Sequence, residues 1–200
     1  LIKSLPLQRR DGTLIGQLLP VGGWSLRDES LISAFTKWRK MFMRFFPSQF
    51  NATPESMKSY LENLSIARAD RILFAVYDVE VGLVGHIGLS NVTAESAELD
   101  NIVRGVSGGE PTLMRIAEGT LLSWAFESLG VEQIVAQVLS FNHMAHDLHA
   151  SFGFVTSESY PLFKNQEGNN VRHNRTDEAG ANVKYRLDII TLAKDAFVPL

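Results

Sequence analysis

Residues 97–111 read AELDNIVRGVSGGEP and join a strand, a glycine-rich turn and the start of a helix. Residues 97–104 have a strand composition, and the side chains of a strand alternate between two faces. Alternation puts one set on one face (Glu98, Asp100 and Ile102) and a second set on the other (Leu99, Asn101 and Val103). Two carboxylates therefore project together from a half-exposed strand, where they are either ordinary polar positions or proton acceptors.

The turn at residues 104–109, RGVSGG, leads directly into a helix that we expect Pro111 to open. Such a turn presents unpaired backbone N–H groups and the positive end of the helix dipole, so it predicts an anion site suited to a pyrophosphate. It lacks the spacing of a dinucleotide-binding fingerprint, and no Gly-Lys-Ser/Thr follows as in a P-loop. Glu110, near the helix start, is unfavourable to a bound anion.

The other elements follow from apolar periodicity and from capping and turn residues. We expect further strands at residues 14–21, 72–77, 82–91, 134–139, 154–163 and 183–191, and a loop at 165–182. Helices are expected from a Ser25 cap to Pro47, from a Thr53 cap with Pro54 at its first position, from Pro111 to Gly130, and from an Asn142 or Ser140 cap to Gly153. This order predicts an α/β fold in a single domain, residues 1–200, with a mixed, mostly antiparallel sheet that is locally parallel in the middle.

Composition excludes several classes of protein. Apolar residues make up 45% of the 200 residues, and 19 Lys and Arg against 22 Asp and Glu give a net charge of −3, which argues against a nucleic-acid partner. Without cysteine the chain holds no disulfide, thiolate metal site or cysteine nucleophile. No apolar run approaches the roughly 20 residues that span a bilayer, so we expect no membrane association and a cytoplasmic location.

A second motif follows the predicted 134–139 strand: NHMAHDLHASFGF, residues 142–154. The order of elements, the Arg-led glycine turn and this Asn-x-x-Ala…Gly-Phe run resemble the GNAT superfamily of acetyl-CoA-dependent N-acetyltransferases. The resemblance covers residues 71–154, with Asn142, Ala145, Gly153 and Phe154 in register. In the turn, Ser107 stands where the family has its first glycine and Gly109 matches the second. His149 stands where the family usually carries a tyrosine.

The resemblance implies where acetyl-CoA would bind: between two central parallel strands that splay apart, here residues 97–104 and 134–139. Pantetheine would lie along Ile102, Val103 and Arg104, and a backbone N–H there would polarise the thioester carbonyl. The remaining cofactor contacts would come from Ser107, Gly108, Gly109 and Asn142. His149 would protonate the departing thiolate, and Glu98 or Asp100 would deprotonate the amine. His86, inside a strand, is interpreted as structural, and the spread of His143, His146 and His149 around one short helix predicts no metal site.

Basic and aromatic residues alternate along residues 37–46, KWRKMFMRFF. One interpretation is an amphipathic core helix with a solvated basic face. The other, from the resemblance, is the acceptor side of the site, where Arg44, Phe46 and Arg172 would hold an anionic acceptor such as a nucleotide-linked amino sugar.

The sequence thus predicts transfer of an acetyl group from acetyl-CoA to a primary amine of a small molecule. Two alternatives remain: acetylation of a protein or peptide, and a non-catalytic acyl-CoA-binding module. A third, an interaction domain without a ligand, would not respond to CoA. The oligomeric state is open, with a homodimer among the alternatives.

Overall fold

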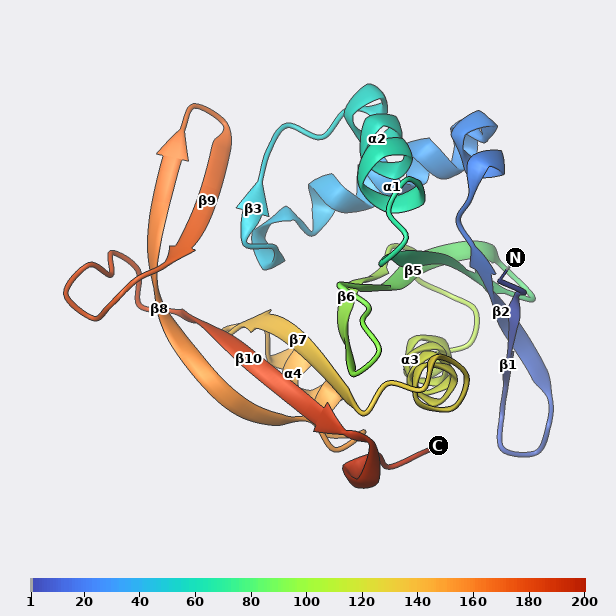
Figure 1. The fold of residues 1–200 in the computed structure, drawn as a ribbon. Helices are drawn as coiled ribbons and strands as arrows, with labels where there is room; N and C mark the ends of the chain where they lie inside the picture. Colours follow the sequence, from blue (N-terminus) through green and yellow to red (C-terminus); the bar gives the residue numbers. More distant parts are fainter. Residues whose placement is uncertain (1) are drawn as a thin grey trace.

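A ten-stranded sheet runs through the molecule in the order β1-β2-β4-β5-β6-β7-β10-β8-β9-β3 (Figure 1). The structure, a computed structural model, describes residues 2–200. The strands are β1 (Leu5–Gln8), β2 (Leu14–Pro20), β3 (Ser48–Gln49), β4 (Ile72–Asp78), β5 (Gly82–Ser90), β6 (Ser96–Arg104), β7 (Gln133–Leu139), β8 (Val155–Glu167), β9 (Asn170–Arg175) and β10 (Arg186–Ala193). Every strand pair is antiparallel except β6 and β7, which confirms the predicted fold class.

Helices cover both faces of the sheet and create two apolar layers. They are α1 (Glu29–Met41), α2 (Pro54–Tyr60), α3 (Leu113–Trp124) and α4 (His143–Ala150), with π-helical turns at Leu61–Ile66 and Ala125–Leu129. Short 3-10 turns lie at Gly23–Arg27, Met43–Phe45 and Lys194–Ala196. On one face, Phe35 and Trp38 of α1 pack with Leu73 and Val103. On the other face, Leu113 and Leu121 of α3 pack with Phe74 and Leu99.

Three helix boundaries differ from the predicted ones. Asp28, not Ser25, caps α1 by accepting from Leu31 N at 2.9 Å, since Ser25 lies in the preceding 3-10 turn and its hydroxyl donates to Gly22 O at 2.7 Å. α1 ends at Met41, because a 3-10 turn replaces the expected continuation towards Pro47. α3 begins at Leu113 rather than Pro111.

Three other predicted helix ends are confirmed. The Thr53 capping box with Pro54 and the left-handed Gly130 at the end of the helical run are as expected. Asn142 is the residue that caps α4.

The predicted loop at residues 165–182 is wrong over its first half. β8 continues to Glu167, the chain turns at Gly168 with φ 60°, and β9 returns beside it. β9 also pairs with β3, which lies in the segment between α1 and α2, with Ser48 opposite Arg172. Figure 1 shows the β8–β9 hairpin beside β3, so α1, α2 and this hairpin lie on the same side of the molecule.

Candidate active site

The parallel strands β6 and β7 pair only at their beginnings. Their register runs from Ser96 opposite Gln133 to Leu99 opposite Ala136 and stops there. β7 stays fully paired with β10 on its other side. The two strands therefore separate in the middle of the sheet, as expected for a splayed pair of parallel strands.

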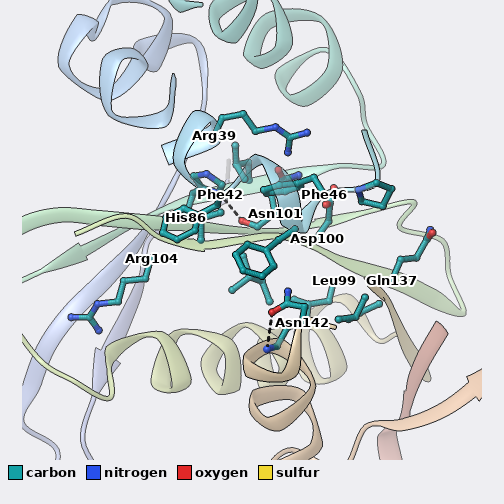
Figure 2. Close-up of a pocket in the computed structure, with 18 of the residues that line it drawn as sticks. Arg39, Phe42, Phe46, His86, Leu99, Asp100, Asn101, Arg104, Gln137 and Asn142 are labelled. Atoms are coloured by element: carbon teal, nitrogen blue, oxygen red, sulfur yellow. Dashed lines mark hydrogen bonds between the residues drawn. The ribbon is translucent and has the colours of Figure 1, made fainter. Parts of the chain in front are cut away.

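A cavity of about 620 Å³ opens at this separation. Its lining comes from α1 and the turn after it, from the diverging halves of β6 and β7, and from α4 (Figure 2). Figure 2 places Arg39, Phe42 and Phe46 on one side of β6 and Asn142 on the other. Of the predicted site residues, the following line the cavity: Phe46, Glu98, Asp100, Ile102, Val103, Arg104, Asn142 and His149. Ser107, Gly108, Gly109, Arg44 and Arg172 lie outside its lining.

A β-bulge interrupts β6 at the cavity wall. His86 is opposite Val103 and Gly88 is opposite Asp100, so one more residue of β6 than of β5 lies between these pairs. Asn101 has a left-handed φ of 55°, which is uncommon outside glycine but is tolerated by asparagine. Its side-chain amide donates to Tyr60 Oη at 3.0 Å.

The predicted alternation of side chains along β6 is wrong after Asp100 because of the bulge. Ile102 packs with the α3 layer together with Leu99, while Val103 belongs to the α1 layer. Asp100 and Asn101 both contact residues of the α2 side, Arg71 and Tyr60 respectively. Ile102 therefore does not share a face with Asp100, because the extra residue shifts the alternation by one position.

His86 holds the carbonyl group of the bulge. Its Nδ1 lies 2.6 Å from Asn101 O, and its ring packs 4.7 Å from the ring of Phe35, centroid to centroid. Burial lowers the pKa of His86 to about 4, so the ring is neutral near pH 7. Since a carbonyl oxygen only accepts, Nδ1 is the protonated nitrogen of that ring.

The two predicted base candidates differ in their partners. Asp100 forms an ion pair with Arg71, whose guanidinium also donates to Tyr60 Oη at 2.9 Å. Glu98 accepts from two neutral amides, Asn91 Nδ2 at 2.7 Å and Gln137 Nε2 at 2.8 Å. Within residues 2–200, the charge of Asp100 is thus matched by a cation, and that of Glu98 is not.

His149 is paired with a buried carboxylate that the sequence analysis did not single out. His149 Nδ1 lies 2.7 Å from Glu118 Oε1, and Glu118 is 0% exposed while His149 is 4% exposed. Glu118 Oε2 has no hydrogen-bond partner within residues 2–200. The spacing of apolar residues on α3 places Glu118 on the buried face, and that is the signal that could have identified it.

The glycine turn is held by side chains that bind its own backbone. Arg104 donates to Gly108 O at 2.6 Å and to Glu110 O at 2.9 Å, so its guanidinium organises the turn, and Figure 2 shows it directed away from the aromatic residues. Asp78 accepts from Glu110 N at 2.8 Å. Trp38 lies where a side chain on Gly105 would be, which explains a glycine at that position.

Carboxylates occupy part of the region where a pyrophosphate is expected. Glu110 accepts from Thr112 N at 3.1 Å and from Arg9 Nε at 3.0 Å, and hydrogen bonds from Thr112 and Arg9 lower its pKa to about 2. In the described part of the chain, the N–H groups of Met114 and Arg115 at the start of α3 have no hydrogen-bond partner. These two donors remain available to an anion.

Arg39 lines the cavity together with Arg71 and Arg104. Its guanidinium lies 3.7 Å from the ring centroid of Phe46 and 5.1 Å from that of Phe50, and donates to Ser48 O at 2.8 Å. Its Nε is buried without a hydrogen-bond partner within residues 2–200, and no carboxylate of that range pairs with it. Burial lowers its pKa to about 10, so the group is charged near pH 7. The sequence analysis placed Arg39 in the basic run but did not distinguish it from its neighbours.

The predicted acceptor cations, Arg44 and Arg172, lie outside the cavity lining. Arg44 is exposed and stacks over Phe45 at 4.6 Å. Arg172 is exposed on β9, opposite Ser48. In residues 2–200, no three His, Asp or Glu side chains gather closely enough to hold a metal ion, and none of the helices there is long and apolar enough to cross a membrane.

Comparison with known proteins agrees with this arrangement. The sequence pattern of a family described as Acetyltransferase (GNAT) domain matches residues 23–155. The chain therefore belongs to the GNAT acetyltransferase family and is an acyltransferase, as the two sequence motifs predicted. Among curated proteins, none matches the sequence significantly.

Several solved structures share the fold. Campylobacter jejuni N-acetyltransferase PseH in complex with acetyl coenzyme A is 18% identical, with a TM-score of 0.58 over 90% of this chain and 99% of that one. Spermidine N-acetyltransferase from Vibrio cholerae, in complex with CoA and spermine, is 17% identical, with a TM-score of 0.65 over 90% and 95%. A probable GNAT acetyltransferase from Chromobacterium violaceum is 15% identical, with a TM-score of 0.68 over 96% and 87%.

Proposed function

We propose that this protein transfers the acetyl group of acetyl-CoA to a primary amine of a small molecule that carries an anionic group. The observation that carries the proposal is the separation of β6 from β7, with a cavity of about 620 Å³ and a bulged strand at its wall. A strand that loses its partner leaves backbone donors and acceptors that an extended ligand can pair with. The pantetheine arm of acetyl-CoA is such a ligand, and it would lie along Ile102, Val103 and Arg104.

The pyrophosphate would lie at the beginning of α3. The free N–H groups of Met114 and Arg115, with the backbone of Ser107, Gly108 and Gly109, would donate to it, and the helix dipole adds positive potential. Glu110 and Asp78 would oppose binding there by their charge. Both charges would make the binding of acyl-CoA weaker.

The transfer itself needs proton acceptors and a proton donor. Glu98 would take the proton that the ammonium group loses, because its charge is not matched by a cation whereas that of Asp100 is. The neutral amine then attacks the thioester carbon, a C–N bond forms, and the carbonyl oxygen becomes negative. A backbone N–H of the bulge would stabilise that oxygen.

Collapse of this intermediate breaks the C–S bond, and the sulfur leaves with the electron pair. His149 would give the thiolate the proton on Nε2, while Glu118 holds Nδ1–H and supplies the counter-charge to the doubly protonated ring. The nitrogen loses two protons overall and the sulfur gains one, so one proton goes to solvent. Asn142 would remain a cofactor contact at the start of α4, where it caps the helix.

Arg39 would be the centre of the acceptor pocket. Arg39 is half-buried, and its buried Nε has no hydrogen-bond partner within residues 2–200, so an anion that pairs with this guanidinium would be favourable. The aromatic rings beside it suit a planar group. A nucleotide-linked amino sugar has both features, whereas a polycationic amine would meet this charge unfavourably. Phe46 would contact the acceptor directly, and Arg44 and Arg172 would add charge outside the cavity.

The test is release of CoA thiol with a panel of neutral, anionic and polycationic amines, together with the melting temperature in acetyl-CoA. We expect acetyl-CoA to raise the melting temperature and thiol release to be fastest with a nucleotide-linked amino sugar. A raised melting temperature with no turnover of any amine favours the non-catalytic module. Fastest turnover of a peptide would favour the protein acetyltransferase.

A further inference from the structure

We infer that His86 is a positioning residue that locks the β-bulge of β6 so that the Ile102 N–H faces the acetyl carbonyl. The inference rests on the proposed binding of acetyl-CoA between β6 and β7, and it assigns His86 a role beyond the structural one that its place in a strand suggests.

The first step is the geometry of one peptide group. The described peptide bonds are all trans, so the C=O of Asn101 and the N–H of Ile102 point in opposite directions. His86 Nδ1 binds Asn101 O at 2.6 Å from the β5 side. The Ile102 N–H is therefore directed away from His86, and the proposal requires that it face the side on which β7 has separated from β6.

The orientation of this peptide group depends on a backbone conformation that is unfavourable by itself. Asn101 has φ 55°, a left-handed conformation that costs free energy in a residue with a side chain. Two hydrogen bonds hold it: His86 Nδ1 on the carbonyl, and Tyr60 Oη on the side-chain amide at 3.0 Å. Only the first acts directly on the peptide group that carries the Ile102 N–H.

The ring of His86 is itself held in place by its neighbours. The His86 ring is packed by Phe35 at 4.7 Å and by Trp38 at 6.2 Å between ring centroids. Burial keeps the His86 ring neutral, so the ring carries a single N–H proton. That proton lies on Nδ1, because the carbonyl oxygen of Asn101 that faces Nδ1 can only accept a hydrogen bond. A donor held in advance in this way needs no rearrangement when charge develops on the thioester oxygen.

The experiment compares affinity for acetyl-CoA with affinity for CoA, by calorimetry, in the wild type and two variants. His86→Leu removes the donor, and His86→Asn keeps an N–H close to the position of Nδ1. Losing one hydrogen bond to the acetyl carbonyl should lower the acetyl-CoA to CoA affinity ratio about five- to tenfold in His86→Leu. His86→Asn should stay within about twofold of the wild type.

Two further measurements separate the lock from packing and from the proposed function. Leu89→Val, on the same strand but outside the cavity lining, should lower stability without changing the ratio. In the free protein, the amide NMR signal of Ile102 should move in His86→Leu and stay near its wild-type position in His86→Asn. An unchanged ratio and an unmoved Ile102 signal in His86→Leu would overturn the inference. If the wild type binds neither ligand, the proposed function fails, and the inference, which rests on it, fails as well whatever the Ile102 signal does.

Discussion

Lowering the pH should destabilise this protein because of His86, and replacing that single residue should remove this part of the destabilisation. Burial lowers the pKa of His86 from 6.5 to about 4. As the pH falls below 6.5, the unfolded chain binds a proton at this position while the folded protein does not. The free energy of unfolding therefore falls between pH 6.5 and 4 and is unaffected by this group above pH 7. From these two pKa values, the loss at pH 4.5 relative to pH 8 is on the order of 2 to 3 kcal/mol.

The assay is urea unfolding at several pH values, with the wild type compared with His86→Leu. Other groups titrate in both proteins, so the difference between the two pH profiles isolates His86. We expect His86→Leu to lack acid destabilisation on the order of 2 to 3 kcal/mol that the wild type shows. Parallel profiles between pH 8 and pH 4.5 would refute the reasoning, because they would mean that the ring takes up its proton equally in the folded and unfolded states.

The other predictions concern the site. His149→Phe should lower kcat about 10²- to 10⁴-fold with little change in acetyl-CoA affinity, and His149→Tyr should recover part of it; full activity of the Phe variant at every pH would mean that water protonates the thiolate. Arg39→Met should raise KM for an anionic acceptor about tenfold or more and leave KM for acetyl-CoA unchanged, whereas Lys37→Met, exposed on the same helix, should change neither. Glu110→Gln should tighten acetyl-CoA binding about two- to fivefold by removing a negative charge from the start of α3, an effect that calorimetry at low salt would detect and that a weaker affinity would contradict.

Much of the fold could be predicted because its elements carry strong local patterns. The strands around residues 72–104 are rich in apolar and β-branched residues, and Thr53, Pro54 and Gly130 mark helix ends by their backbone preferences. The β8–β9 hairpin was missed for the opposite reason. Its residues are mostly polar and exposed, and β9 pairs with the end of β8 and with the distant β3.

The site was only partly predictable. The motifs identified β6, the glycine turn and α4, but the bulge at Asn101 depends on the register with β5, which no local pattern in β6 specifies. Arg39 and Arg44 look alike in the sequence, and they differ because α1 ends at Met41 and the following 3-10 turn directs Arg44 outwards. Glu118 and His149 meet only through the packing of α3 against α4, 31 residues apart in the chain.

The central claim is tested most directly by a crystal structure of the wild type grown with acetyl-CoA. We predict that pantetheine lies between the separated halves of β6 and β7, with the thioester oxygen within hydrogen-bond distance of Ile102 N and the pyrophosphate at the start of α3. Acetyl-CoA bound elsewhere on the protein, or a site between β6 and β7 that stays without ligand at saturating concentration, would contradict the account.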